Sequence, residues 1–186
     1  MNEAGIIGFA EIFLKEPYKE FYLREIAKKA KISVFAAKKY ADSLVEQKIL
    51  LEERRANLRY FKANLSSRAV KLIKSSLGVY EIEKSGLIEY IKEKIENLSA
   101  IVLFGSVAKG EDALNSDIDL LIVGSEKIVN LSEFEKRLKR DINAHVFNWA
   151  GWNKQLKSNT AFYNDVVIYG ISLYGELPIA HGSKYN

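Results

Sequence analysis

The segment LFGSVAKGEDALNSDIDLLIV, residues 103–123, joins two apolar runs through a charged loop. The first run ends at Gly105-Ser106, and the second begins with two aspartates, Asp117 and Asp119. Apolar strands do not usually begin with alternating carboxylates, because a charged group loses hydration beside a buried sheet. The pattern therefore predicts two strands whose polar ends carry a chemical function.

Asp117 and Asp119 stand at alternate positions of a predicted strand, DIDLLIV, over 117–123. Residues i and i+2 of a strand project to the same face, so the two carboxylates would lie side by side while Ile118 faces the other way. Carboxylates held this close repel each other, and a divalent cation removes the conflict. Mg²⁺ (or Mn²⁺) suits such hard oxygen ligands and shares its other positions with water and substrate phosphates.

A phosphate-binding turn is predicted at Gly105 and Ser106. Gly105 has no Cβ, so a ligand can approach the backbone closely there. The residues SVAKGED, 106–112, can form one helical turn whose first amides face such a ligand, and Lys109 can add a point charge. The segment thus combines a phosphate site and a pair of metal ligands, separated by ten residues.

This Gly-Ser-x10-Asp-x-Asp arrangement resembles the nucleotidyltransferases of the DNA polymerase β superfamily, especially the minimal nucleotidyltransferase domains. The resemblance runs from about Ala100 to Gly175. It implies a nucleoside triphosphate as ligand, with ATP the one expected. The implied roles are nucleotide binding by Gly105, Ser106 and Lys109, and catalytic metal binding by Asp117 and Asp119.

The third carboxylate that the family carries on its next strand is absent from the predicted strand over 142–149. Alternation puts Asn143 and His145 on one face of that strand, and Asp141 stands just ahead of it. Three interpretations stay open. His145 is a catalytic base or ligand, Asn143 is a weakened remnant of the acid, or nucleotide binding survives without catalysis.

The positive charge of the chain lies in its N-terminal third. Residues 1–65 hold 13 Lys/Arg and nine Asp/Glu, and this excess of four equals the formal net charge of the whole chain, +4. The remaining residues are therefore close to neutral. Such an excess indicates a polyanion as partner, or else a mixed solvated surface.

Three helices and a hairpin are predicted in this part of the chain. The helices cover 5–15, 22–30 and 34–48, and the strands cover 49–53 and 59–65. Residues 24–50 resemble winged helix-turn-helix regulators, in which the third helix enters the major groove and the hairpin rests on the DNA backbone. The predicted DNA-binding residues are Ser33, Lys38, Lys39, Arg54, Arg55 and Arg59.

Details of the third predicted helix leave alternatives open. Ser33 is a suitable N-cap, and Ala37, Ala41, Leu44 and Val45 would face inward. Val34 and Phe35 would either touch thymine methyl groups or pack into a partner subunit, and burial is a further explanation for Phe35. The position of Lys48, before the first strand, is often a glycine in winged helices.

The predicted fold class is α+β, with four parts along the chain. They are a winged helix-turn-helix over 1–66, a helical connector over 67–98 broken at Gly78 and Gly86, a nucleotidyltransferase-like mixed sheet flanked by helices over 99–178, and a tail over 179–186. No run approaches the roughly 18 apolar residues that span a bilayer, and the sequence has no cysteine. We therefore expect a cytoplasmic protein without a membrane partner.

The predicted function combines the two halves. A DNA-binding protein would bind Mg-NTP and transfer a nucleoside monophosphate to an acceptor hydroxyl, on a protein or another substrate. The alternative is a transcription regulator whose nucleotidyltransferase-like domain senses nucleotide without catalysis. A homodimer is a further expected partner, because winged-helix regulators often pair.

Overall fold

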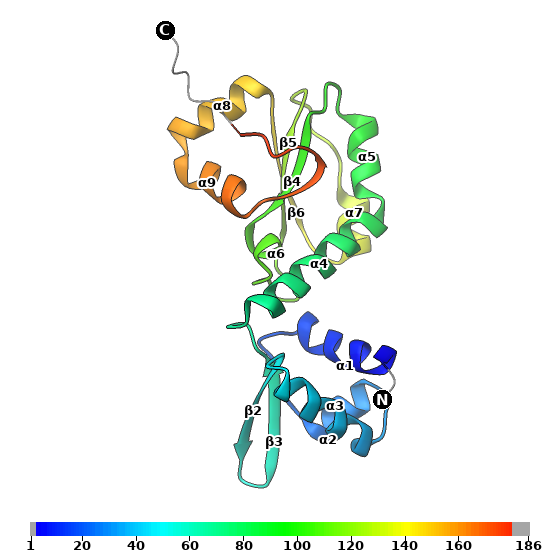
Figure 1. The fold of residues 1–186 in the computed structure, drawn as a ribbon. Coiled ribbons are helices and arrows are strands. Elements are labelled where there is room, and N and C mark those ends of the chain that lie inside the picture. The colour runs from blue at the N-terminus through cyan, green and yellow to red at the C-terminus, as the bar shows by residue number, and fades with distance from the viewer. Residues whose placement is uncertain (1–2, 180–186) are drawn as a thin grey trace. The chain divides into compact units, whose positions relative to one another are not determined.

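The computed structural model describes residues 3–179. The chain divides after Lys74 into two compact units (Figure 1). Of the predicted tail over 179–186, only Ile179 lies within the described residues. Every helix of the described part is too short or too polar to span a bilayer.

The first unit contains short helices followed by a hairpin. Its elements are α1 (Glu3–Lys15), β1 (Phe21–Tyr22), α2 (Leu23–Lys29), α3 (Val34–Glu46), β2 (Leu50–Arg55) and β3 (Leu58–Ala63). The strands form an antiparallel sheet of order β1-β3-β2. The sequence prediction missed β1, and it was wrong to place Arg54 and Arg55 in the hairpin loop, because both belong to β2.

An aromatic and aliphatic core joins the three helices to the sheet. Phe13 of α1 and Phe21 of β1 are fully buried and meet edge to face at 5.4 Å. The inward face predicted for α3 is confirmed, because its alanines at 37 and 41 and Leu44 are buried and Val45 packs against the core while partly buried. Ser33 caps α3 by accepting a hydrogen bond from the backbone N–H of Ala36 at 3.1 Å.

The turn between α3 and β2 contains a position where a glycine would be favoured. Lys48 has a φ of 59° there, in the left-handed region. Glycine reaches this region without steric cost, whereas a residue with a Cβ does not. Lys48 stands where the winged-helix pattern often has a glycine, and its backbone is therefore locally strained in this turn.

The predicted connector consists of α4 (Arg68–Ser85) and α5 (Leu87–Lys94). The break expected at Gly78 is wrong, because α4 runs through it; the break at Gly86 is confirmed, with a φ of 81°. A Cβ at Gly78 would lie 2.6 Å from Cγ1 of Val107. Gly78 therefore serves close packing within the second unit rather than a turn.

The second unit is built on a mixed sheet. Its further elements are β4 (Ala100–Phe104), α6 (Gly105–Lys109), β5 (Ile118–Val123), α7 (Ser132–Leu138), β6 (Ile142–Phe147), α8 (Trp149–Ser158), α9 (Thr160–Tyr169) and β7 (Ile171–Gly175). The strand order is β6-β5-β4-β7. β4 is antiparallel to both neighbours, whereas β5 and β6 are parallel.

Helices cover both faces of this sheet, with α5 and α7 on one side and α8 and α9 on the other (Figure 1). All residues of β4 are buried, as its uniformly apolar sequence predicts. Helix α8 was missed: the strand predicted to reach residue 149 ends at Phe147, and Trp149 begins the helix. Its Trp152 is fully buried and donates from Nε1 to the carbonyl of Pro178.

Candidate functional site

The strand register brings Gly105 and Asp119 together. β4 ends at Phe104, which pairs with Asp119 of β5, and α6 begins at the next residue. Gly105 has a φ of 70°, and a Cβ built on it would overlap the carboxylate of Asp119. Glycine is therefore required here twice, by backbone conformation and by the closeness of the acid.

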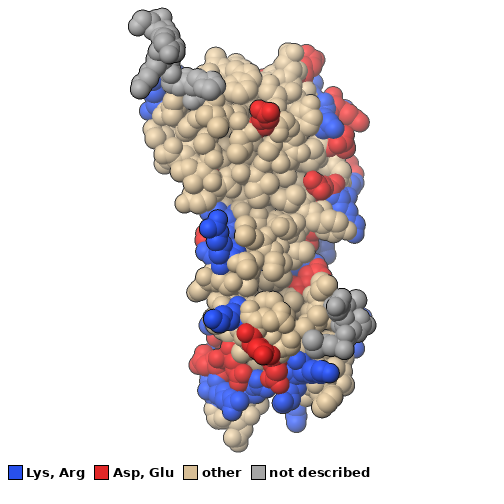
Figure 2. All heavy atoms as spheres, in the orientation of Figure 1, with Lys and Arg blue, Asp and Glu red and all other residues tan. Residues whose placement is uncertain are grey.

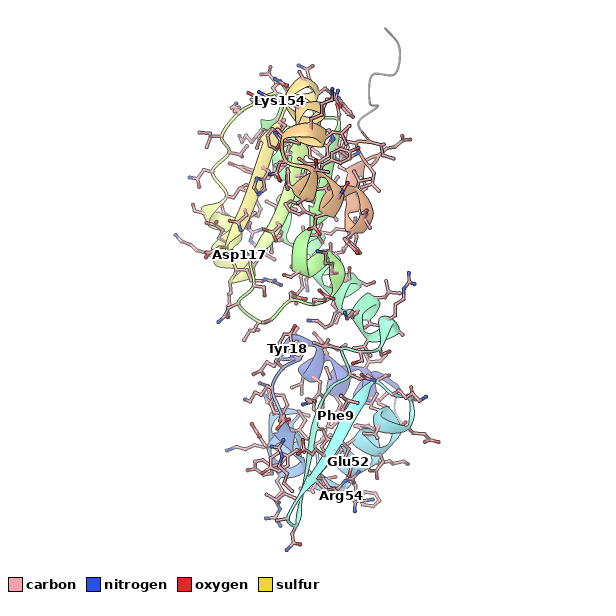
Figure 3. The ribbon with its side chains drawn as sticks, turned by 90° about the vertical axis from the view of Figure 1, so that its left-hand side faces the viewer. Phe9, Tyr18, Glu52, Arg54, Asp117 and Lys154 are labelled. Carbon is pink, nitrogen blue, oxygen red and sulfur yellow. The ribbon has the colours of Figure 1, made fainter. Side chains whose placement is uncertain are left out.

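One amide joins the two aspartates. Nδ2 of Asn143, on β6, donates to Oδ2 of Asp117 at 3.1 Å and to Oδ1 of Asp119 at 3.2 Å. Both carboxylates therefore lie on the same side of the sheet. Figure 3 shows Asp117 at the end of the sheet where β5 begins, and the strand itself starts at Ile118, one residue later than predicted.

This cluster is open to solvent. Asp117 and Asn143 are exposed and Asp119 is half-buried, so a ligand can reach all three. The two negative charges face each other with a single neutral group between them. The amide offers one hydrogen to each carboxylate, which offsets part of their repulsion.

The donor set fits one hard cation that shares its ligands with a substrate. Among residues 3–179, no group of three or more His, Cys, Asp or Glu side chains could hold a metal. Asp117 and Asp119 would supply two carboxylate oxygens, and rotation of the Asn143 amide would turn its carbonyl oxygen toward them. Mg²⁺ accepts such a set, because it keeps several waters and takes phosphate oxygens.

His145 lies on the same face of β6 as Asn143, two residues farther along the strand. It pairs with Leu121, which places it about 6.6 Å farther along the strands than the Asp119–Asn143 pair. The exposed imidazole packs against Phe104 and Phe162, with ring centroids 5.7 and 5.0 Å away. His145 is thus near the aspartates, in an aromatic setting.

The predicted phosphate-binding residues occupy α6. Gly105 and Ser106 are its first two residues, and Lys109 is its last. The ammonium of Lys109 pairs with Asp165 of α9 and lies 4.8 Å from the ring centroid of Tyr169. Sequence reasoning missed Asp165, since no local signal links two residues so far apart in the chain.

The predicted DNA-binding cations of the hairpin are engaged within their own unit. Arg59 donates to both carboxylate oxygens of Glu52, at 2.8 and 2.6 Å, and to Asp42 at 2.6 Å. The Arg59 hydrogen bonds are the main cause that lowers the pKa of Glu52 to about 2. Arg54 also binds Glu52, at 3.0 Å, and Figure 3 labels this pair on β2.

The other predicted DNA-binding cations are all exposed, and two of them form ion pairs. Arg55 is paired with Glu53 and Glu20, and Lys38 with Asp42 at 3.1 Å. Lys39 is exposed on α3. Figure 2 accordingly shows Lys/Arg and Asp/Glu side chains interspersed over the visible face of this unit.

The start of α3 carries an exposed apolar pair. Phe35 is 80% exposed and Val34 is 45% exposed. Within the described residues, Phe35 therefore has no buried packing role, which removes that explanation for its place on the helix. It remains available to a partner outside the unit.

The family model described as "Polymerase beta, Nucleotidyltransferase" matches residues 85–175, a little under half of the chain. No curated protein matches the sequence. The chain is similar to several solved structures. One is a toxin–antitoxin with AMP-PNP, with 24% identity over 48% of this chain and 71% of that chain and a TM-score of 0.37. Another is a mutant of the toxin–antitoxin MntA–HpeT, with 22% identity over 48% of this chain and 71% of that chain and a TM-score of 0.38. A third is a candidate nucleotidyltransferase from Sulfolobus solfataricus, with 16% identity over 57% of this chain and 87% of that chain and a TM-score of 0.34.

The matched segment begins one residue before Gly86 and ends with β7, so it includes α5, the whole mixed sheet and the aspartate pair beside Gly105. Residues 85–175 of the C-terminal unit are therefore similar to the Polymerase beta nucleotidyltransferase family.

Proposed function

We propose that the second unit binds a nucleoside triphosphate together with Mg²⁺ and transfers the nucleoside monophosphate to an acceptor hydroxyl. The observation that supports this is the cluster in which Asn143 joins Asp117 and Asp119 beside Gly105. Two facing carboxylates without a cation are unfavourable, and a triphosphate brings both the cation and the missing ligands. ATP is the expected nucleotide.

Each residue of the site has a role in this proposal. Asp117 and Asp119 hold the cation and so fix the triphosphate at the end of the sheet where β5 begins. The bare Cα of Gly105 leaves room for the phosphates, and Ser106 contributes its hydroxyl and amide to their oxygens. When bound, Mg²⁺ supplies charge neutralisation at the phosphate oxygens.

The transfer step requires an oxygen nucleophile. The acceptor oxygen forms a bond to the α-phosphorus, the bond from that phosphorus to the bridging oxygen breaks, and pyrophosphate leaves. The proton of the hydroxyl passes to a base, for which His145 is the candidate on this face of the sheet. The alternative function is a transcription regulator in which the same site senses nucleotide and no transfer takes place.

One assay separates these functions. The protein is incubated with each labelled NTP, Mg²⁺ or Mn²⁺, and acceptors that include protein hydroxyls, small molecules and RNA ends. Pyrophosphate release with labelled acceptor supports the transferase. Metal-dependent NTP binding without release supports the sensor, and the absence of metal-dependent binding contradicts both.

Replacing Gly105 by alanine should abolish Mg²⁺-dependent ATP binding. The new Cβ would both occupy the place of the Asp119 carboxylate and force a residue with a side chain to a φ of 70°. The backbone term alone costs about 1–2 kcal/mol. Thermal unfolding and isothermal titration of ATP with Mg²⁺ measure the two effects.

Gly8→Ala is the matched control, since nothing lies within 4 Å of a Cβ built at Gly8. It should leave ATP binding unchanged and stabilise α1 slightly. A Gly105→Ala variant that binds Mg-ATP like the wild type would contradict the placement of the triphosphate beside Gly105.

We also propose that the first unit is a winged helix-turn-helix that binds DNA. The order of its elements, the short turn between α2 and α3, and the hairpin after α3 support this proposal. In it, α3 enters the major groove with Lys38 and Lys39, while Arg54, Arg55 and Arg59 of the hairpin contact phosphates. Pairing with a second copy of the chain would match a two-fold symmetric DNA site.

Replacing Lys38 and Lys39 by alanine should abolish specific DNA binding. If both contact phosphates, the slope of log affinity against log salt falls by about 2, at about 0.9 for each contact. Fluorescence anisotropy with a DNA library at several salt concentrations measures this. The control, Lys92→Ala/Lys94→Ala on α5, removes the same charge elsewhere, and equal affinity of the two variants would indicate a protein partner for α3.

A further inference from the structure

Arg140 is a largely buried cation next to the aspartate cluster. It lies in the turn between α7 and β6, and its side chain is only 10% exposed. Its Nε donates to the backbone carbonyl of Ser116, and its Nη1 donates to Oδ2 of Asp112 at 3.1 Å. Both partners belong to the loop that leads into β5.

The contact with Ser116 matters because Asp117 is the next residue in the chain. Asp119 lies within β5, where it is paired with Phe104 on one side and Asn143 on the other. Asp117 lies before the strand and has no such ladder. Its backbone is held instead at its two neighbours, the carbonyl of Ser116 and the amide of Ile118.

Consecutive residues of the β6 side provide both of these anchors. Arg140 holds the Ser116 carbonyl through its side chain, and the backbone carbonyl of Asp141 accepts from the amide of Ile118 at 2.8 Å. Asp117 is therefore fixed from either side by Arg140 and Asp141. Removal of the guanidinium would free one side, while the ladder would still hold Asp119.

The arrangement is costly as a packing device. Nη2 of Arg140 is buried and has no hydrogen-bond partner within the described residues. An unsatisfied buried donor is unfavourable, and an apolar side chain of similar volume would fill the same space without it. The cost is explained if the guanidinium is needed for the bond to Ser116.

We propose that Arg140 is a positioning residue, which holds the Asp117 carboxylate where it can share a cation with Asp119. This inference rests on the proposed nucleotide-binding function. Partners that orient a metal ligand typically contribute about 10- to 100-fold to metal affinity. Of the two aspartates, loss of Arg140 should act on Asp117, because the strand ladder still holds Asp119.

The test measures Mn²⁺ binding to the full chain by electron paramagnetic resonance, with and without ATP. Arg140→Met should weaken Mn²⁺ binding about tenfold. Arg140→Lys, which can reach one of the two oxygens, should recover part of that loss. The control is Arg137→Met, which removes an arginine of α7 that also donates to a backbone carbonyl, that of Ser85, and it should stay within about twofold of the wild type.

A double-mutant cycle separates positioning from a general loss of structure. In the Asp117→Asn background, Arg140→Met should have no further effect on Mn²⁺ affinity, because the ligand it orients is already gone. An equal tenfold loss in both backgrounds would overturn the proposal. If Arg140→Met does not fold, Asp112→Asn replaces it, with a smaller loss expected in the wild-type background and none beside Asp117→Asn.

Failure of this inference differs from failure of the proposed function. Wild-type protein that binds Mn²⁺ and ATP, with a folded Arg140→Met variant of equal affinity, overturns only the role of Arg140. Wild-type protein that binds neither overturns the proposed function itself.

Discussion

Replacing Asp117 and Asp119 together by asparagine is expected to abolish Mg²⁺-dependent ATP binding. The two carboxylates are the acids that Asn143 brings together, at 3.1 and 3.2 Å from its Nδ2. Without their charges a cation has only neutral oxygens, which are poor ligands for Mg²⁺ in water. We expect a loss of affinity of about 1,000-fold, or roughly 4 kcal/mol, with turnover lost in parallel.

The free energy of unfolding without metal should not fall with the loss of Mg-ATP affinity. The double variant removes the repulsion between two facing charges, so without metal its free energy of unfolding should equal or exceed that of the wild type. Saturating Mg-ATP at about 100 times its Kd should add about 2.7 kcal/mol to the wild type and nothing to the variant. Chemical denaturation with and without Mg-ATP measures both quantities.

The control variant is Glu89→Gln/Glu133→Gln. Both glutamates are exposed, on α5 and α7, and their replacement changes the net charge by the same amount. It should bind Mg-ATP like the wild type. If the Asp117→Asn/Asp119→Asn variant binds Mg-ATP as tightly as the wild type, these two residues do not hold the cation. Both the transferase and the sensor proposals would then fail.

β4, and β5 apart from its first predicted residue, could be predicted because their signals are local. A run of apolar residues, a glycine and a period of two depend only on neighbouring residues. They correctly gave β4 and the common side of the two acids. A helix signal was also present at α8, where the Asn148 side chain caps the backbone amide of Gly151, and the sequence prediction overlooked it.

Pairings between distant residues could not be predicted. Glu20 meets Lys62 and Asp42 meets Arg59 only because β1 and α3 lie against the hairpin. The charge count of residues 1–65 predicted the positive excess of the first unit, but it could not predict that its hairpin cations are paired with carboxylates. The ties from Asn143 and Arg140 to the Asp117 region likewise depend on the parallel pairing of β5 with β6.

Replacing Asn143 by aspartate should restore the third carboxylate that the sequence lacks. In the absence of metal the variant should be less stable, since two hydrogen bonds to carboxylates become two like-charge contacts. Because Asn143 is exposed, solvent screens these contacts, and we expect a loss of about 1–2 kcal/mol. Asn143→Ala, which loses the hydrogen bonds without adding a charge, should lose less.

With Mg²⁺ present the order should reverse. Three carboxylates at the same end of the sheet bind a divalent cation more tightly than two, and an increase of about 10- to 100-fold in Mg²⁺ affinity is expected. The variant should then be at least as stable as the wild type. Asn153→Asp, an exposed change on α8, adds the same charge elsewhere and should show neither effect.

The same variant distinguishes slow catalysis from its absence. If the neutral amide limits transfer, Asn143→Asp should raise kcat while the Kd of the nucleotide changes little, because a third carboxylate serves the attacking hydroxyl more than the triphosphate. If the second unit is a sensor, tighter metal binding should appear without pyrophosphate release. Weaker Mg²⁺ binding than in the wild type would contradict the assignment of Asp117, Asp119 and residue 143 as the cation site. An added carboxylate that faces a cation site should strengthen the binding of the cation.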